Sequence, residues 1–336
     1  MKQTFSQQSN TSNAALSSQD LRGVLLPITT PFDAAGNVDL VGLRANIARW
    51  NTTGISGYVL LGSTGERAHL DEREYLEVIE AARAGIEQRP YGLTFIAGAG
   101  QQSTRGTINE IKRVSERVNV DAFLIITPHF YRSSITQQAL IAHYQSIADA
   151  SPAPVILYSM PALTGIKIEP ETAARLSEHE NIIGIKDSSA DLEGLRETIK
   201  LVRKDFAVLT GNGTVLNLAL SAGACGGILA VGCVAPEICL EIFRAVTVGE
   251  NEHASSLQTA LTPLAQAVTT RFGIGGLKAA LEMKGYVGGS VRAPLAPPSD
   301  EAREEIRRCL EELAVKMPGT PRESNKLVEH KAELKA

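Results

Sequence analysis

The chain has 336 residues, 43% of them hydrophobic and 21% charged, which is enough apolar material for a large buried core. This length is roughly twice the ~150 residues of an average domain. The 33 Lys and Arg residues against 37 Asp and Glu give a net charge of −4, so no basic excess favours nucleic acid or an anionic membrane. We therefore expect small-molecule partners. Few aromatic residues and 29 glycines favour alternating strands and helices over an all-β sandwich.

Neither end of the chain has the composition of a packed core. Residues 1–20 are rich in Ser, Thr, Asn and Gln, without the apolar run of a secretory signal or the several arginines of a mitochondrial one. We expect a disordered lead over residues 1–21, a flexible tail over residues 317–336 and a cytoplasmic location. The charge-free stretch at residues 211–236 is interrupted by glycine and asparagine, so we expect no membrane-spanning helix.

Motifs for metals and nucleotides are missing from the sequence. The four cysteines form no C-x-x-C pair and the six histidines no H-x-x-H pattern, so we expect reduced thiols and no metal site. No glycine cluster completes G-x-G-x-x-G after a first strand or G-x-x-x-x-G-K-[ST], which argues against a dinucleotide or nucleoside triphosphate. The glycines of residues 211–213 leave a phosphorylated substrate possible.

Short apolar runs alternate with segments of helical periodicity. Strands are predicted at residues 23–29, 57–61, 93–97, 122–126, 154–158, 182–186, 207–210 and 227–231. Helices are predicted at residues 38–53, 71–88, 104–118, 136–150, 169–177, 192–203 and 215–222. The strands are continuously apolar, as expected when both faces are buried in a parallel sheet. The pattern predicts an α/β fold, a (β/α)8 TIM barrel, with a doubly wound open sheet as the alternative.

The domain boundaries follow from the same pattern. Residues 22–235 carry the strand–helix alternation and should form the barrel, whereas residues 236–316 show helical periodicity only. No linker separates the two parts. We therefore expect one barrel with a C-terminal helical extension rather than two independent domains.

The active site of a TIM barrel lies at the C-terminal ends of its strands, and there Lys186 is unusual. Four apolar residues precede it, so its amine should be partly desolvated at the mouth of the barrel and should act as a nucleophile toward a ketone. Tyr158 ends the preceding strand. Adjacent strands lie about 4.8 Å apart, so its phenol could meet the amine and shuttle protons. The alternatives are a solvated lysine and a tyrosine that hydrogen-bonds to a loop.

Ser63 and Thr64 lie between two glycines, directly before a predicted helix. Their hydroxyls and backbone N–H groups could bind a carboxylate. The pattern by itself is common in tight turns.

Four motifs in order make the chain resemble a known family. They are GSTGE at 62–66, TP at 127–128, LYSMPALTG at 157–165 and IIGIKDSS at 182–189. Over residues 23–315 the chain resembles the dihydrodipicolinate synthase/N-acetylneuraminate lyase family of Schiff-base-forming class I aldolases. The resemblance implies that Lys186 forms the imine, that Tyr158 relays protons, and that Ser63 and Thr64 bind the carboxylate of a 2-oxo acid. It implies no cofactor beyond the lysine imine, and a homotetramer.

Within this family, residues 271–295 and 133–144 are similar to the 4-hydroxy-2-oxoglutarate aldolase type. Two residues depart from the family pattern. Leu163 stands where lysine-pathway synthases carry an arginine that holds a second carboxylate. Phe130 stands where the family usually has a tyrosine lent to a neighbouring subunit, which leaves Tyr131 as a possible relay.

We therefore expect a carbon–carbon lyase that acts on a 4-hydroxy-2-oxo acid, with 4-hydroxy-2-oxoglutarate giving pyruvate and glyoxylate as the first expectation. Ser188, Gly211 and Asn212 are further candidates for substrate binding, and Ser188 could select the distal end of the substrate. A 4-hydroxy-tetrahydrodipicolinate synthase and a sugar-acid aldolase or dehydratase are the alternatives with the same chemistry. A non-catalytic sensor of 2-oxo acids is the alternative from another class.

Overall fold

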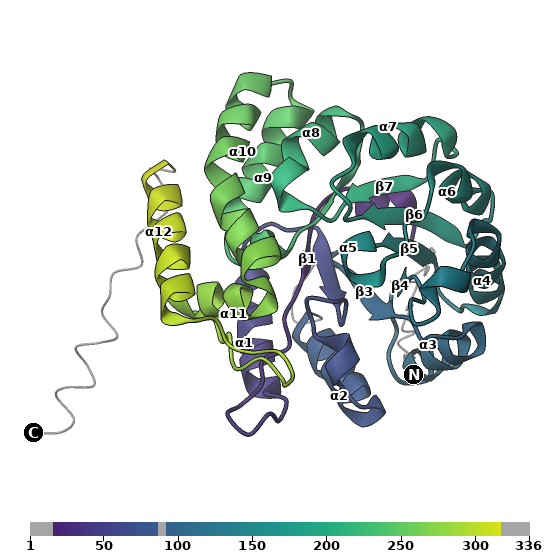
Figure 1. The fold of residues 1–336 in the computed structure, drawn as a ribbon, viewed down its shortest axis with the longest axis horizontal. Helices are drawn as coiled ribbons and strands as arrows, with labels where there is room; N and C mark the ends of the chain where they lie inside the picture. The colour runs from purple at the N-terminus through teal and green to yellow at the C-terminus, as the bar shows by residue number, and fades with distance from the viewer. Residues whose placement is uncertain (1–15, 87–91, 317–336) are drawn as a thin grey trace, which may run out of the picture.

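A computed structural model describes residues 16–86 and 92–316. Within these residues, eight parallel strands pair in sequence order and close into a barrel, with β8 beside β1. They are β1 (Gly23–Pro27), β2 (Gly57–Leu60), β3 (Thr94–Ala99), β4 (Ala122–Ile126), β5 (Val155–Ser159), β6 (Ile182–Asp187), β7 (Ala207–Thr210) and β8 (Gly226–Ile228). The predicted TIM barrel is confirmed, and the open doubly wound sheet is excluded because the sheet has no free edge (Figure 1).

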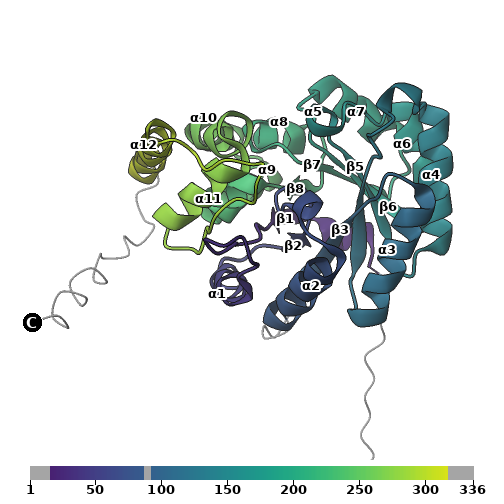
Figure 2. The same ribbon diagram turned by 60° about the horizontal axis from the view of Figure 1, so that its bottom comes forward.

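Helices surround the barrel and continue beyond it. They are α1 (Leu40–Trp50), α2 (Glu72–Ile86), α3 (Thr104–Arg117), α4 (Gln137–Ala150), α5 (Pro161–Thr164), α6 (Pro170–Ser177), α7 (Leu192–Leu201), α8 (Leu216–Ser221), α9 (Pro236–Thr247), α10 (Asn251–Gln266), α11 (Gly273–Met283) and α12 (Asp300–Lys316). α9 to α12 follow the last strand and lie together on one flank of the barrel (Figure 2). The sequence did not predict the single turn α5.

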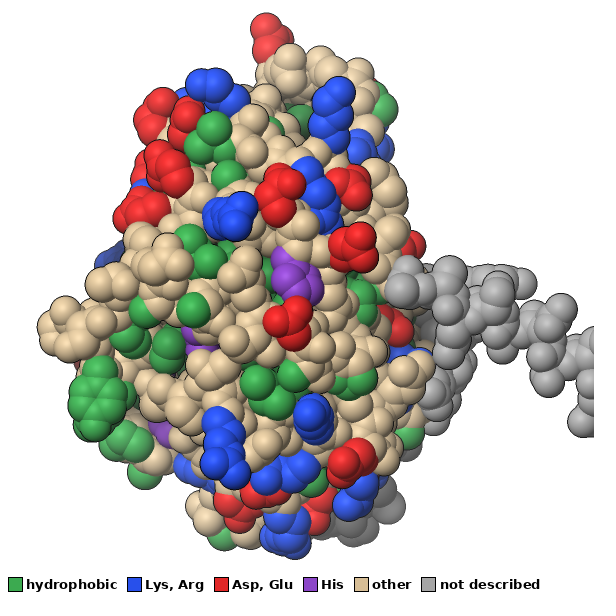
Figure 3. Space-filling model, turned by 90° about the vertical axis from the view of Figure 1, so that its right-hand side faces the viewer, with side chains coloured by type: hydrophobic (Ala, Val, Ile, Leu, Met, Phe, Trp, Pro, Cys, Tyr) green, Lys and Arg blue, Asp and Glu red, His purple; other side chains and the backbone are tan. Residues whose placement is uncertain are grey.

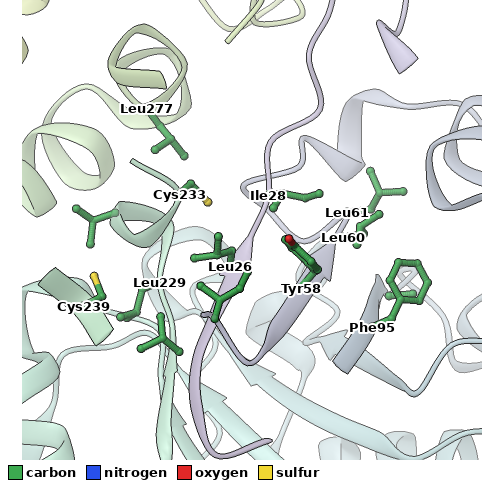
Figure 4. Packing of buried hydrophobic residues seen from close by; sticks show 14 of the residues in the cluster. Leu26, Ile28, Tyr58, Leu60, Leu61, Phe95, Leu229, Cys233, Cys239 and Leu277 are labelled. Atoms are coloured by element: carbon green, nitrogen blue, oxygen red, sulfur yellow. The ribbon is translucent and has the colours of Figure 1, made fainter. Parts of the chain in front are cut away.

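Alternate residues of each strand belong to two apolar layers. Leu25, Val59 and Ile96 pack inside the barrel, whereas their neighbours Leu26 and Leu60 pack in the larger cluster between the strands and the helices. Figure 4 shows part of this outer layer. Because successive side chains of a strand point to opposite faces, a strand buried on both sides must be apolar throughout. This is the pattern that the sequence displayed.

The first described segment closes the bottom of the barrel. Ser18–Leu21 form a short 3-10 helix, η1, and Leu21 is fully buried in the cluster that fills the barrel interior. This corrects the predicted disordered lead, because residues 18–21 have regular structure. Burial of one leucine explains it, since an apolar side chain of this size gains about 2 kcal/mol on leaving water. The rest of the lead, residues 1–15, and the predicted tail, residues 317–336, lie outside the described residues.

The last strand is shorter than predicted. β8 ends at Ile228, and Ala230–Cys233 form a 3-10 helix, whereas the sequence predicted a strand to residue 231. The start of β8 approaches β1 very closely, and a Cβ on Gly226 would lie 2.1 Å from the carbonyl oxygen of Gly23. Glycine therefore allows the two strands that close the barrel to pair.

The C-terminal extension packs back onto α1. The side-chain amide of Asn46 donates to the carbonyl of Val287 and its oxygen accepts from the backbone N–H of Val287, both at 2.8 Å. The Trp50 ring stacks on Tyr286 with 5.2 Å between ring centres. These contacts fix the segment after α11 against the first βα unit.

The surface and the cysteines agree with the composition. Figure 3 shows positive and negative side chains interspersed on one face, without an extended field of one sign. None of the described helices is long and apolar enough to cross a membrane. All four cysteines are free thiols. Burial raises the pKa of the Cys239 thiol to about 12.

His143, on α4, should make stability depend on pH. Burial lowers the pKa of this imidazole to about 4, while its Nδ1 lies 2.9 Å from the Thr104 hydroxyl. An unfolded histidine titrates near 6.5, so the unfolded chain binds the proton first as pH falls. Stability should be complete above pH ~6.5 and should fall by about 2 kcal/mol between pH 7 and pH 5. Urea midpoints at both pH values should show that H143Q loses this dependence, whereas the surface variant H253Q keeps it.

Candidate functional site

Lys186 and Tyr158 lie side by side at the C-terminal end of the barrel. They are paired residues of β6 and β5, and both side chains are more than nine-tenths buried. The Nζ of Lys186 lies 4.2 Å from the centre of the Tyr158 ring. An amine against an aromatic face is attracted by the ring's negative face when it carries a proton. The structure thus places an amine and a phenol in one buried spot, as the strand order predicted.

A shift of one residue in the strand register makes this pairing possible. Val155 pairs with Ile182, but the next residue, Ile156, pairs with Gly184, so Ile183 is the extra residue. Without the shift, Tyr158 would face Ile185. A Cβ on Gly184 would lie 2.7 Å from the carbonyl oxygen of Ala207, so the shift also depends on a glycine. Such irregularities re-aim side chains and are frequent next to active sites.

Ser63 connects the loop after β2 to Tyr158. Its Oγ lies 2.9 Å from the Tyr158 hydroxyl, and either atom can donate. Thr64 follows on the same loop and is half-buried. The Ser63 hydroxyl therefore lies beside the Tyr158 hydroxyl, and the Lys186 amine lies against the Tyr158 ring.

The loop that carries Ser63 has an unusual backbone. Leu61 and Glu66, which flank it, both have a φ of 54°, in the left-handed region that non-glycine residues rarely adopt. A Cβ on Gly65 would lie 2.9 Å from the backbone of Leu61, so the loop folds tightly on itself. The Thr30 hydroxyl donates to the Gly65 carbonyl at 2.7 Å. Strained backbone of this kind persists where surrounding contacts hold it, and it occurs preferentially at functional sites.

Glu66 is held by the C-terminal extension. Its buried carboxylate forms a 2.6 Å ion pair with Lys278 of α11, and it accepts from the backbone N–H of Arg292 at 3.1 Å. Burial lowers the pKa of Lys278, although the contact with Glu66 opposes this. The guanidinium of Arg292 in turn forms a forked pair with Glu74 at 2.6 and 2.8 Å. Glu66, Glu74, Lys278 and Arg292 could not be recognised as part of the site from the sequence.

Gly211, which directly follows β7, packs against Lys186. A Cβ at this position would lie 2.8 Å from Cε of Lys186 and 1.8 Å from Oγ of Ser188. Ser188 thus lies beside the lysine, as its sequence position suggested. The side-chain oxygen of Asn212 accepts from both the N–H and the hydroxyl of Thr214, at 2.9 and 2.8 Å. That oxygen caps a turn, so only the amide nitrogen of Asn212 is left for a substrate.

A cavity of about 560 Å³ opens at this end of the barrel. Ser63 and Tyr158 line it, and the Lys186 amine lies against the ring of Tyr158. Among the predicted site residues, those that do not line this cavity include Thr64, Lys186, Ser188, Gly211 and Asn212. The other lining residues come from the loops after β2, β3 and β4 and from α2, α3 and α5. Among them are Arg67, Glu72, Gln101, Gln102, Glu110, Arg113, His129 and Leu163.

The charged side chains of this cavity are paired with one another. Arg67 pairs with Glu110, and Arg113 pairs with Glu72 at 2.8 Å. Burial lowers the pKa of the Arg67 guanidinium. Arg67 was not predicted as a site residue, although it directly follows the GSTGE motif, because a charged side chain in such a position usually faces solvent.

Leu163, Phe130 and Tyr131 lie on the surface near the cavity. Leu163 has 62% of its surface exposed, and the two aromatic residues have about 70% each. The rings of Phe130 and Tyr131 meet edge to face with 5.0 Å between their centres. Among the described residues, no hydrogen bond joins Tyr131 to Ser63 or Tyr158.

One cluster of potential metal ligands lies away from the barrel mouth. Ligand atoms of Glu241, Glu250 and His253 lie within 4.8 Å of one another. Arg244 already donates to the two carboxylates, at 2.7 and 2.6 Å. A cation of the chain itself therefore neutralises this exposed cluster.

Comparison with known proteins shows the family of the chain. A model of the dihydrodipicolinate synthetase family matches residues 20–313. The chain is 36% identical over 294 residues to a 4-hydroxy-tetrahydrodipicolinate synthase of Methanothrix thermoacetophila, covering 87% of this chain and 97% of that protein. It is 35% identical over 295 residues to the protein of the same name from Haloarcula marismortui, covering 88% and 94%.

A solved structure extends the likeness to the fold. The dihydrodipicolinate synthase of Acinetobacter baumannii, determined in complex with pyruvate, superposes with a TM-score of 0.80 and 29% identity. The match covers 88% of this chain and 99% of that one. The chain belongs to the dihydrodipicolinate synthetase family and is a class I aldolase, a lyase, on a TIM barrel.

Proposed function

We propose that this enzyme forms an imine between Lys186 and pyruvate and uses it to make or break a carbon–carbon bond with an aldehyde. The observation that carries the proposal is the buried contact of the Lys186 amine with Tyr158, whose hydroxyl lies 2.9 Å from Ser63. A neutral amine attacks the C2 carbonyl of a 2-oxo acid, and loss of water leaves the imine. The imine draws electrons from C3, so the reaction needs no separate cofactor.

Tyr158 is the proposed proton relay. Loss of a proton from C3 converts the imine to an enamine, which attacks the aldehyde carbonyl, and the resulting alkoxide must gain a proton. In the direction of cleavage, the C4 hydroxyl gives up its proton as the C3–C4 bond breaks. The Tyr158 hydroxyl contacts Ser63, and the ring that carries this hydroxyl lies against the lysine amine. The enamine that remains on Lys186 then gains a proton at C3, and water hydrolyses the resulting imine and releases pyruvate.

Ser63 and Thr64 are the proposed ligands of the C1 carboxylate. The loop before α2 offers hydroxyls and backbone N–H groups, and a tight glycine-containing turn presents such donors to an anion. On the opposite side, Ser188 and Gly211 lie against the lysine side chain. We assign these two residues, with the amide nitrogen of Asn212, to the walls that enclose the bound substrate.

The names of the relatives favour the synthase reaction as the first candidate for the aldehyde partner. Tetrahydrodipicolinate carries two carboxylates and a ring nitrogen, and pyruvate supplies only one carboxylate and no nitrogen. The partner would therefore be an amino acid aldehyde with its own carboxylate. The relatives give no support to the finer expectation from the sequence, cleavage of 4-hydroxy-2-oxoglutarate.

Leu163 favours a second candidate for the partner, an aldehyde whose binding does not require an arginine at position 163. An isobutyl group lines the cavity where the lysine-pathway synthases resembled by this chain carry a guanidinium, and the two arginines of the cavity are paired with glutamates. Glyoxylate from 4-hydroxy-2-oxoglutarate, or a sugar-acid aldehyde, would fit this arrangement. Both candidates use the same chemistry at Lys186.

The tetramer implied by the family resemblance is also part of the proposal. Phe130 and Tyr131 present exposed aromatic rings beside the cavity, where contact with a second copy would bury them. Tyr131 is the side chain that could then act as a relay between subunits. Light scattering of the purified chain measures the oligomeric state directly.

Borohydride trapping tests the imine. Incubation with pyruvate and borohydride should reduce the imine to a stable adduct on Lys186, detected by peptide mass spectrometry. K186A should give no adduct, whereas Y158F should give one at a rate lower by roughly 10²-fold, since a positioned acid–base group contributes about that much. An adduct on another lysine, or none in the wild-type chain, would overturn the proposal.

A panel of aldehydes offered with pyruvate decides between the two candidates. Aspartate 4-semialdehyde, glyoxylate and a short sugar-acid aldehyde should differ in kcat/KM, with the first preferred if the synthase reaction is correct. The matched variant is L163R, which restores a guanidinium. It should raise kcat/KM for an aldehyde bearing a distal carboxylate by at least ~10-fold, the effect of one charge-assisted hydrogen bond of about 1.5 kcal/mol. An unchanged preference would show that position 163 does not select the aldehyde.

G211A should displace the lysine. The added methyl group would lie 2.8 Å from Cε of Lys186, so the amine must move, and we expect adduct formation to slow by roughly 10²-fold. S188A/G211A separates the two contacts, because it removes the clash with the serine hydroxyl and leaves the one with the lysine. If the double variant traps pyruvate at the wild-type rate, the close approach to Lys186 is unimportant.

A further inference from the structure

We propose that the buried ion pair of Glu66 and Lys278 positions the loop of residues 62–65 for the carboxylate of the 2-oxo acid. Through this pair the C-terminal extension takes part in substrate binding. The inference rests on the proposed function, because it assigns a task to the loop that carries Ser63 and Thr64. Glu66 and Lys278 would be positioning residues, since they act on the substrate only through that loop.

The pair is buried, and both charged groups make close contacts. The side chains of Glu66 and Lys278 are 0% and 2% exposed, and their charged atoms lie 2.6 Å apart. Lys278 also donates to the carbonyl of Ser290 at 2.6 Å. The second carboxylate oxygen of Glu66 accepts from the N–H of Arg292 and lies 3.1 Å from Nδ1 of His69. Contacts from two parts of the chain thus fix this carboxylate.

The loop needs such an anchor. Its backbone enters at Leu61 and leaves at Glu66 in the left-handed region, a conformation that costs an L-residue energy and relaxes unless neighbouring contacts enforce it. Glu66 is therefore both a strained residue and the attachment point of the loop. A loop fixed here at one end keeps Ser63 within 2.9 Å of Tyr158.

The extension is itself well anchored, so it can serve as a fixed support. Lys278 lies in the middle of α11, with its amine 4.4 Å from the centre of the Phe32 ring. The following segment is held to α1 by Asn46 and Tyr286, described above. Arg292 adds a forked pair to Glu74 on α2. Two residues of this anchored part of the chain, Lys278 and Arg292, thus contact Glu66 directly.

Stability alone is a poor reason to keep such a pair. Desolvation of two charges offsets most of their attraction, and apolar replacement of a buried pair is often neutral or stabilising. Removal of a single partner, by contrast, leaves an unpaired buried charge. The two effects can be separated, because a neutral double variant repairs stability without restoring the geometry that the charged contact enforces.

The test measures pyruvate dependence of borohydride trapping in K278M, E66Q and E66Q/K278M, together with the melting temperature of each. We expect K278M to melt lowest and the double variant to recover most of the loss. The concentration of pyruvate that gives half-maximal trapping should rise by roughly tenfold or more in all three, since small displacements of binding groups have effects of this size. The maximal trapping rate should fall less, because Lys186 and Tyr158 are untouched. K278R, which keeps the charge, should recover part of the affinity.

E282Q is the matched control. Glu282 lies on the same helix and pairs with Arg303 at 2.8 Å, but on the surface, and its loss should leave the pyruvate dependence unchanged. If K278M does not fold, the double variant decides alone. Wild-type pyruvate dependence in the double variant would overturn the inference and reduce the pair to a stabilising contact. Absence of any adduct in the wild-type chain would defeat the proposed function instead, so the two failures are distinguishable.

Discussion

The register between β5 and β6 is the constraint on which the site depends. Parallel pairing places Tyr158 opposite Lys186 only because one residue, Ile183, is inserted between two paired positions. Ile182 and Ile185 both pack in the outer layer, whereas Ile183 packs inside the barrel, so the insertion changes which face the following residues occupy. Since side chains alternate with a period of two, an unshifted strand would give Lys186 the same face as Ile182, away from the barrel interior. A local irregularity therefore decides whether Lys186, the proposed nucleophile, faces the interior of the barrel.

A second constraint acts from outside the barrel. The loop that carries Ser63 is strained, and its far end, Glu66, is held by Lys278 of the extension. In this proposal the barrel strands position the lysine amine and the phenol, while the appended helices position the carboxylate site. The extension accordingly packs on α1 and against Glu66. Its buried apolar residues belong to the same cluster as those of the barrel.

The sequence predicted the strands, most helices and the meeting of Lys186 with Tyr158, because continuous apolar runs and chain order determine a parallel barrel. It could not predict the register shift, since a run such as residues 182–185 is apolar on both faces and carries no mark of which residue is inserted. It also missed the Glu66–Lys278 pair and the Arg67–Glu110 pair, whose partners are far apart in sequence and look like ordinary surface charges until tertiary structure buries them. The disordered lead predicted from the sequence was too long, because a single leucine in a polar segment gives no sign that it packs into the barrel interior.

The residues proposed for the imine chemistry and those proposed to select the aldehyde lie on different parts of the fold. Lys186 and Tyr158, the proposed imine lysine and proton relay, are fixed by strand pairing. The wall of the cavity away from Tyr158, here called the far wall, includes Arg67, Arg113 and Leu163. The two arginines are neutralised by neighbouring glutamates, and Leu163 is exposed. Loops tolerate substitution far better than paired strands do, so one barrel can keep its imine chemistry while its acceptor changes. Overall similarity to synthases therefore bears on the imine chemistry more strongly than on the aldehyde, for which the side chains of the far wall are the more direct evidence.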